Sequence, residues 1–129
     1  MYNRIRKTDY KSDGYLNGLD IVTKDYRELY NEYKEFENVV FLVDPPYLST
    51  NAGSYTNYWK LSDYLDVLDV IQYSKYFYFT SNKSQIIELC NWIANRKTFR
   101  NPFEGSQTCT MNANVTYNCS YKDIMVAKL

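Results

Sequence analysis

Hydrophobic residues along this chain fall into short continuous runs and into helically spaced positions. The continuous runs predict β-strands at residues 19–22, 39–43, 75–80, 97–99 and 124–127. Between the first four runs, apolar residues recur three or four positions apart, which predicts three amphipathic helices. Strands that alternate with helices predict an α/β fold with a mostly parallel sheet and helices on its faces. The last two strands have no helix between them, so we expect an antiparallel C-terminal hairpin at one edge.

Each predicted helix begins after a polar residue that can cap it. Asp25 with Glu28 has the spacing of a capping box, Ser62 is expected to cap the second helix, and Asn82 with Gln85 the third. The apolar faces comprise Tyr26, Leu29, Tyr30 and Tyr33; Leu65, Leu68 and Ile71; and Ile86, Leu89, Cys90 and Ile93. Residues 1–18, 48–60 and 101–120 are polar and irregular. The 129 residues fit one domain, 1–129, with 1–18 as an irregular lead-in.

Composition restricts the chemistry. The chain has no His, which excludes a His base or a His-ligated metal. Its three cysteines, Cys90, Cys109 and Cys119, are odd in number and lack C-x-x-C spacing, so we expect neither a disulfide framework nor a zinc site. No segment resembles a signal peptide or a membrane span, and we interpret the protein as cytoplasmic.

Charge gives a weaker indication. The net charge is zero, so the whole chain has no electrostatic signature of a nucleic-acid binder. Two local clusters of basic residues stand out: Arg4, Arg6, Lys7 and Lys11, and later Arg96, Lys97 and Arg100. Each cluster either contacts phosphates or is a solvated surface segment, and the sequence leaves both interpretations open.

The tetrapeptide Asp44-Pro45-Pro46-Tyr47 ends the apolar run 39–43. Ligands of open α/β sheets bind beyond the carboxyl ends of the strands. There, the Asp44 carboxylate and the Pro45 carbonyl can accept the two N–H bonds of an exocyclic amine, and two prolines keep the turn rigid. The Tyr47 ring offers a surface on which a flipped-out base can stack. The alternative is a simple strand-ending turn, but the position after a buried strand favours a functional site.

With these residues, the chain resembles the Dam-type adenine-N6 DNA methyltransferases, whose catalytic motif matches residues 44–47. The resemblance implies a partial Rossmann-like methyltransferase sheet and methyl transfer from S-adenosylmethionine to a flipped-out adenine in double-stranded DNA, as in restriction-modification. It implies catalytic roles for Asp44, Pro45, Pro46 and Tyr47. It also places Asp25 and Tyr26, together with Asp44, near the methyl donor, although Asp25 can equally be only a helix cap.

Weaker similarities follow in the order of the family. Tyr2-Asn3 and the basic stretch resemble the end of the target-recognition region, residues 54–56 the loop after the catalytic motif, 80–82 the end of the next strand, and 121–129 the final edge strand. The DNA-binding candidates are therefore Arg4, Arg6, Lys7, Ser54, Tyr55 and Asn82. The aromatic residues Tyr55, Tyr58 and Trp59 either reach DNA or pack against the following helix. The polar segment 101–120 either approaches DNA or is an irregular connection.

The chain lacks the elements with which the family binds its methyl donor. These are a Phe-x-Gly-x-Gly-like loop after a first strand, an upstream Lys and a downstream acidic residue. The four glycines are at 14, 18, 53 and 105, and none of them forms such a loop. We therefore expect a C-terminal catalytic portion that does not methylate alone and whose partner is the missing N-terminal methyltransferase region. Two alternatives remain open. One is amine methylation of RNA or protein, and the other is a non-catalytic DNA-binding or self-associating module that dimerises through an exposed sheet edge.

Overall fold

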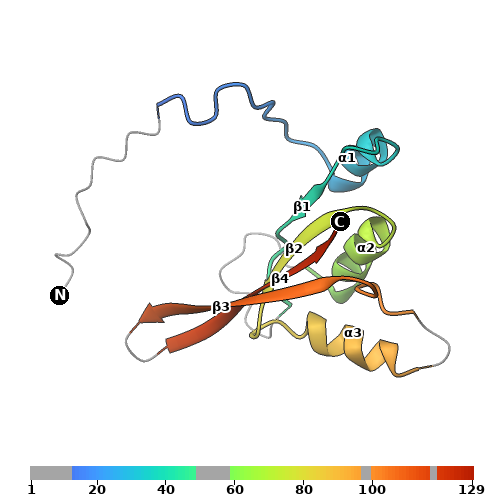
Figure 1. The fold of residues 1–129 in the computed structure, drawn as a ribbon, viewed down its shortest axis with the longest axis vertical. Helices are drawn as coiled ribbons and strands as arrows, with labels where there is room; N and C mark the ends of the chain where they lie inside the picture. The colour runs from blue at the N-terminus through green and yellow to red at the C-terminus, as the bar shows by residue number, and fades with distance from the viewer. Residues whose placement is uncertain (1–12, 49–58, 97–99, 117–118) are drawn as a thin grey trace.

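The computed structural model describes residues 13–48, 59–96, 100–116 and 119–129. In chain order, the elements are α1 (Tyr26–Tyr33), β1 (Phe41–Val43), α2 (Leu61–Ile71), β2 (Tyr76–Ser81), α3 (Ile86–Ala94), β3 (Gln107–Thr116) and β4 (Cys119–Lys128). The strands form one sheet in the order β1-β2-β4-β3 (Figure 1). The α/β class predicted from the sequence is confirmed.

The sheet is mixed, so the prediction of a mostly parallel sheet is wrong. Only β1 and β2 are parallel, and both β2–β4 and β3–β4 are antiparallel. The reason is that a parallel pair needs a crossover connection, and α2 provides one between β1 and β2. β4 instead follows β3 directly and lies between β2 and β3, so it runs against both neighbours.

The predicted C-terminal hairpin at the sheet edge is confirmed, but its first strand is β3, which lies in the segment 101–120 that the sequence predicts to be irregular. The strand candidate 97–99 lies outside the described residues. β3 escaped the prediction because it is an edge strand rich in Thr and Asn, whose side chains stay largely solvated from Gln107 to Asn112. Figure 1 shows the hairpin extending well beyond the rest of the sheet.

The predicted strand at residues 19–22 does not form. These residues belong to no helix or strand, and the side chains of Leu19, Ile21 and Val22 are 62%, 75% and 55% exposed. A strand requires a neighbouring strand to bond its backbone groups, and none of the described strands pairs with this segment. The apolar run therefore predicted a strand whose partner is not among the described residues.

The core lies on one face of the sheet. Phe41 pairs with Tyr76, Val43 with Tyr78, and Tyr78 with Val126, so these side chains share a face. Buried residues of α2 and α3 belong to the same hydrophobic cluster: Tyr64, Val67, Leu68, Ile71, Ile86 and Cys90. α1 joins this side, since its Tyr30 ring lies 5.0 Å from the Phe41 ring. The described helices therefore cover one face rather than both, and Leu42 on the opposite face is 74% exposed.

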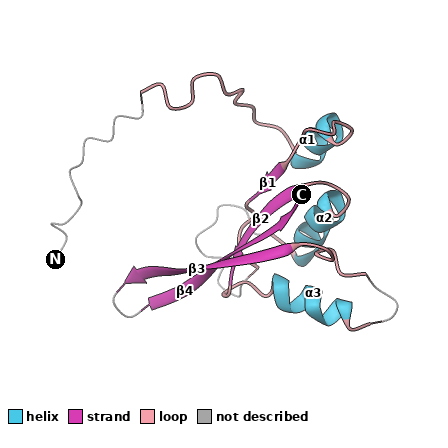
Figure 2. Ribbon diagram, in the orientation of Figure 1, coloured by secondary structure: helices cyan, strands magenta, loops and turns pink. Residues whose placement is uncertain are grey.

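Figure 2 shows the three helices in cyan, and two of their three predicted caps need correction. Asp25 caps α1 as expected, since its carboxylate accepts a hydrogen bond from the Arg27 N–H at 2.9 Å. The second helix already includes Ser62, and Asp63 instead accepts from the Lys60 N–H at 2.7 Å. Gln85 does precede α3, but the Asn82 side chain bonds to β4 instead of capping the helix.

The part of the chain that the structure describes contains neither a metal-binding cluster nor a membrane-spanning helix. No three Cys, Asp or Glu side chains gather there in a way that could hold a metal ion. None of the described helices is long and apolar enough to cross a membrane.

Cys90 and Cys109 are expected to differ in reactivity. Cys90 is buried, and burial raises the pKa of its thiol to about 11. Since the thiolate is the reactive form, Cys90 is protected both by its protonation and by its burial. Cys109 is exposed on β3. At pH 8, iodoacetamide is expected to modify Cys109 and spare Cys90, as peptide mass spectrometry would show. Urea-unfolded protein, in which both should react, is the control. Equal labelling in the native state would contradict the core position of Cys90.

Candidate active site

The tetrapeptide lies where the sequence places it, immediately beyond the last residue of β1. Asp44 is exposed, Pro45 is buried, and Pro46 and Tyr47 are half-buried. Because β1 and β2 are parallel, the end of β2 lies at the same edge of the sheet. The tetrapeptide therefore borders the crevice in which α/β sheets bind ligands.

A first cavity of about 270 Å³ opens on the helix side of β1. Its walls come from α1, β1, the tetrapeptide and α2, with these lining residues: Tyr26, Leu29, Tyr30, Phe41, Leu42, Val43, Asp44, Pro45, Pro46, Trp59, Val67, Val70 and Ile71. The Tyr26 and Trp59 rings stack with their centres 6.4 Å apart. This cavity is apolar and aromatic, with Asp44 as its charged residue.

Tyr26 is held in this wall from several sides. The Arg27 guanidinium lies 4.6 Å from the centre of the Tyr26 ring and forms an ion pair with Asp66 of α2. The Tyr26 hydroxyl is buried and has no hydrogen-bond partner among the described residues. Burial raises the pKa of this phenol. A buried hydroxyl without a partner, in the wall of a cavity, is a polar group that a ligand can satisfy.

A second cavity of about 440 Å³ lies against the hairpin. It is lined by Asp44, Tyr47, Phe79, Thr80, Cys109, Thr110, Met111, Tyr121, Asp123, Ile124 and Met125. Met125 pairs with both Phe79 and Cys109, and Asp123 pairs with Met111. These side chains point away from the core face, because Val126 beside Met125 is buried in the core.

Asp44 lines both cavities. Tyr26 stands in the wall of the first cavity and Tyr47 in the wall of the second. Two ligands, one bound in each cavity, would meet at the Asp44 carboxylate. The negative charge of Asp44 would then act on their reacting atoms. The arrangement suits transfer of a group between two bound molecules.

Tyr47 is fixed in the second cavity by its own hydrogen bonds. Its hydroxyl donates to Asp123 Oδ1 at 3.4 Å, and its carbonyl accepts from the Tyr64 hydroxyl at 3.3 Å. Burial, followed by the negative charge of Asp123, raises the pKa of Tyr47. The phenol therefore stays neutral at physiological pH, and its ring is held at a defined place beside Asp44.

The other predicted residues divide into three groups. Asp25 does not line either cavity and caps α1, whereas Asn82 is exposed in the turn after β2. Arg4, Arg6, Lys7, Ser54 and Tyr55 lie outside the described residues. In the late basic cluster, Arg96 stacks on Trp92 at 4.3 Å and Arg100 pairs with Glu104 at 2.8 Å. These two contacts favour the interpretation of that cluster as a surface segment.

Sequence reasoning missed the contribution of the hairpin. Tyr121 and Asp123 line the second cavity from β4, and neither was a candidate. The signal was present, because Tyr121, Asp123 and Met125 alternate on one face of a strand. The hydrophobic run covers only residues 124–127, and the family resemblance extends the strand to 121–129 without giving these side chains a role. β4 begins at Cys119, and it lies between β2 and β3 rather than at the edge that the resemblance implies.

The chain is thus an α/β protein with a mixed sheet and two cavities that share the Asp44 carboxylate. The chain is also similar to a protein of Haemophilus influenzae (strain ATCC 51907 / DSM 11121 / KW20 / Rd) described as "Putative methyltransferase". The two are 30% identical over an alignment of 131 residues, which covers 98% of this chain and 44% of that protein. No family model matches the chain. No solved structure matches it either. The chain is thus a distant homologue of a protein with the description "Putative methyltransferase" and spans less than half of its length.

Proposed function

We propose that this chain carries the acceptor side of an adenine-N6 DNA methyltransferase that uses S-adenosylmethionine. The observation that carries the proposal is the position of Asp44 in the walls of both cavities. A methyl donor in the first and an adenine in the second would bring the methyl group and the amine together at this residue. The relationship to a protein described as a methyltransferase supports group transfer of this kind.

The tetrapeptide supplies the groups that make the adenine amine nucleophilic. The Asp44 carboxylate accepts one N–H of the amine, and the Pro45 carbonyl accepts the other. These bonds draw the nitrogen lone pair out of the ring and towards the donor. S-adenosylmethionine, when bound, supplies the electrophilic methyl group. Asp44 then stabilises the positive charge that develops on the nitrogen until its proton passes to solvent water, which is electrostatic stabilisation by a group already in place. Tyr47 holds the base by stacking.

The first cavity fits part of such a donor. The Tyr26 and Trp59 rings suit the adenine ring of the donor, and the buried Tyr26 hydroxyl without a partner suits one of its polar atoms. The volume of about 270 Å³ lies just below the roughly 300–1,000 Å³ of ordinary ligand pockets. We infer that a further polypeptide segment completes the donor pocket.

That segment would cover the exposed edge of β1. Leu42 is 74% exposed on this edge strand, and Leu19 and Ile21, in the segment before α1, are 62% and 75% exposed. Edge strands with apolar surface tend to pair with another strand. We propose the remaining methyltransferase region as the partner. Self-association through the same edge is the alternative, which size-exclusion chromatography with light scattering would reveal as a dimer.

The test uses the purified chain and a chimera in which it replaces the matched region of the Haemophilus protein. Calorimetry with sinefungin, an unreactive analogue of the donor, measures donor binding. Methyl transfer is followed with radiolabelled S-adenosylmethionine on DNA, RNA and protein. We expect the chimera to form N6-methyladenine in DNA and the chain alone to form none, because its donor pocket is incomplete.

Different results would change the proposal in different ways. Label in RNA or protein but not in DNA would contradict DNA as the methyl acceptor, but it would agree with methyltransferase activity. Transfer to DNA by the chain alone would contradict the need for a further segment. An inactive chimera beside an active Haemophilus protein would contradict the proposed function as a whole.

A further inference from the structure

The turn between β2 and α3 connects the tetrapeptide to the hairpin. The Asn82 N–H donates to the Lys122 carbonyl at 3.0 Å, and the Lys122 N–H donates to Asn82 Oδ1 at 2.8 Å. On the other side, the Leu48 N–H donates to Ser84 Oγ at 3.2 Å and the Gln85 N–H donates to the Leu48 carbonyl at 2.8 Å. Lys83 lies between these two anchors, so its backbone is presented from a fixed position.

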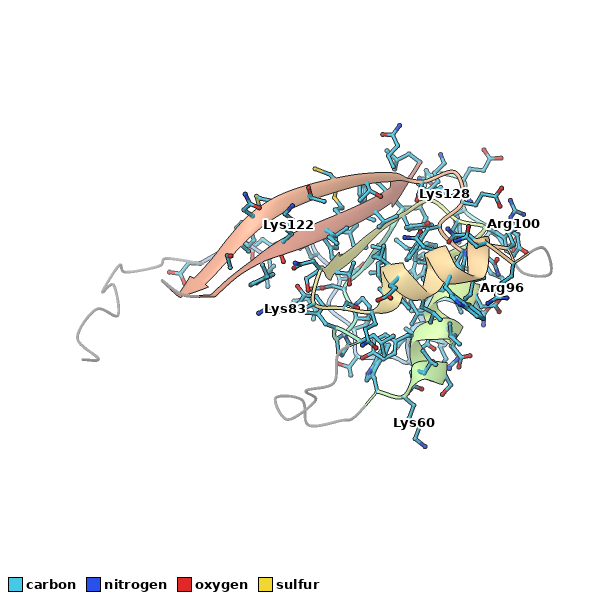
Figure 3. The ribbon with its side chains drawn as sticks, turned by 90° about the horizontal axis from the view of Figure 1, so that it is seen from below. Lys60, Lys83, Arg96, Arg100, Lys122 and Lys128 are labelled. Carbon is cyan, nitrogen blue, oxygen red and sulfur yellow. The ribbon has the colours of Figure 1, made fainter. Side chains whose placement is uncertain are left out.

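The Lys83 side chain reaches the wall of the second cavity. Its ammonium lies 4.7 Å from the centre of the Tyr121 ring, and Tyr121 lines that cavity together with Asp44 and Tyr47. The contact is a cation–π interaction, which orients the ammonium beside the ring. Figure 3 shows Lys83 and Lys122 towards the hairpin, whereas Lys60, Arg96 and Arg100 lie elsewhere on the molecule.

The charge of the cavity explains why a cation is needed at this place. Asp44 and Asp123 both line it, so an anionic nucleotide that binds there approaches two carboxylates. Like charges at close range raise the free energy of such a complex. A positive group at the cavity wall offsets this repulsion and gives the strand a point of attachment.

We propose that Lys83, oriented by Tyr121, binds a backbone phosphate of the nucleic-acid strand whose base occupies the second cavity. This proposal rests on the proposed function for the nature of the acceptor. It adds a contact that neither the basic clusters nor the sequence motifs indicated. The net charge of zero is compatible with it, because phosphate binding requires only local positive charge.

The experiment compares Lys83→Gln with Lys60→Gln, a matched change at an exposed lysine at the start of α2. Fluorescence polarisation measures the affinity of the whole 129-residue chain for a labelled single-stranded adenine-containing oligonucleotide between about 50 and 200 mM salt. A single strand is used because its bases need not be flipped out of a duplex. Loss of one phosphate contact is expected to reduce the slope of log affinity against log salt by about 0.7 and the affinity about fivefold at 0.1 M salt.

The control variants decide between charge and structure. Lys60→Gln is expected to leave both slope and affinity unchanged, and Lys83→Arg is expected to retain both, because it keeps the charge and the ring contact. Circular dichroism melting curves confirm that each variant is folded. If Lys83→Gln behaves like Lys60→Gln, or if Lys83→Arg loses the same slope as Lys83→Gln, the proposal is overturned.

Failure of the proposed function gives a separate result. If the wild-type chain does not bind the oligonucleotide, the phosphate site is overturned. Calorimetry of the chimera with sinefungin then shows whether donor binding survives, because the donor pocket of the chain alone is incomplete. Donor binding without oligonucleotide binding would agree with a methyltransferase and would reject the phosphate contact of Lys83. The absence of both would count against the proposed function itself.

Discussion

Asp44→Asn is expected to lower methyl transfer to DNA by about 10²–10³-fold in the chimera with the Haemophilus protein, the loss typical of removing a preorganised charge-stabilising group. An asparagine can still accept one N–H bond, but it has no negative charge to stabilise the developing positive charge on the amine. Binding of the donor analogue should change little, because the aromatic walls of the first cavity remain. The measurement is the rate of transfer at saturating donor and DNA.

The matched control for this variant is Asp69→Asn. Asp69 is an exposed carboxylate of α2 that lines neither cavity and accepts from Gln72 Nε2 at 2.7 Å. Both substitutions are at the surface, so each should keep the free energy of unfolding within about 0.5 kcal/mol of wild type. Asp44→Asn retaining a tenth or more of the activity, or Asp69→Asn losing as much, would contradict the role of Asp44.

The part of the fold that the sequence predicted is the part with a local hydrophobic signal. β1, β2 and the three helices bury one face, so their apolar residues recur at strand or helix spacing. β3 gave no such signal, because an edge strand needs only one neighbour and its side chains face water. Residues 19–22 gave a false strand signal, because apolar residues form a strand only where another strand can pair with them.

The candidate site divides in the same way. Asp44 and Tyr47, which line the cavities, were predicted because they follow the end of an apolar strand, and Tyr26 was predicted because the family resemblance implied it. Asp123, Tyr121 and Lys83 were not, because their position depends on the antiparallel insertion of β4 beside β2. The register that pairs Ser81 with Asp123 brings them together. It joins residues far apart in the chain, and no local pattern encodes it.

The donor cavity depends on the packing of α2, and Leu68 fixes that helix to the core. Its side chain is 1% exposed within the core cluster, while its neighbours Val67, Val70 and Ile71 also line the first cavity. Leu68→Ala is expected to lower the free energy of unfolding by about 2–5 kcal/mol, because it removes buried methyl groups and leaves a void. Small domains have about 5–15 kcal/mol in total, so this one change can remove much of the stability.

Leu65→Ala is the matched control, since it makes the same chemical change on the same helix. The sequence pattern placed Leu65 on the apolar face, but it is 37% exposed. Its loss should therefore cost less than about 1 kcal/mol, because less apolar surface is returned to water. Urea unfolding followed by circular dichroism measures both variants at 25 °C. Equal losses would contradict the orientation of α2. A large loss of stability for Leu68→Ala alone would support this orientation. Weaker binding of sinefungin by the folded fraction of that variant would show that core packing shapes the donor cavity.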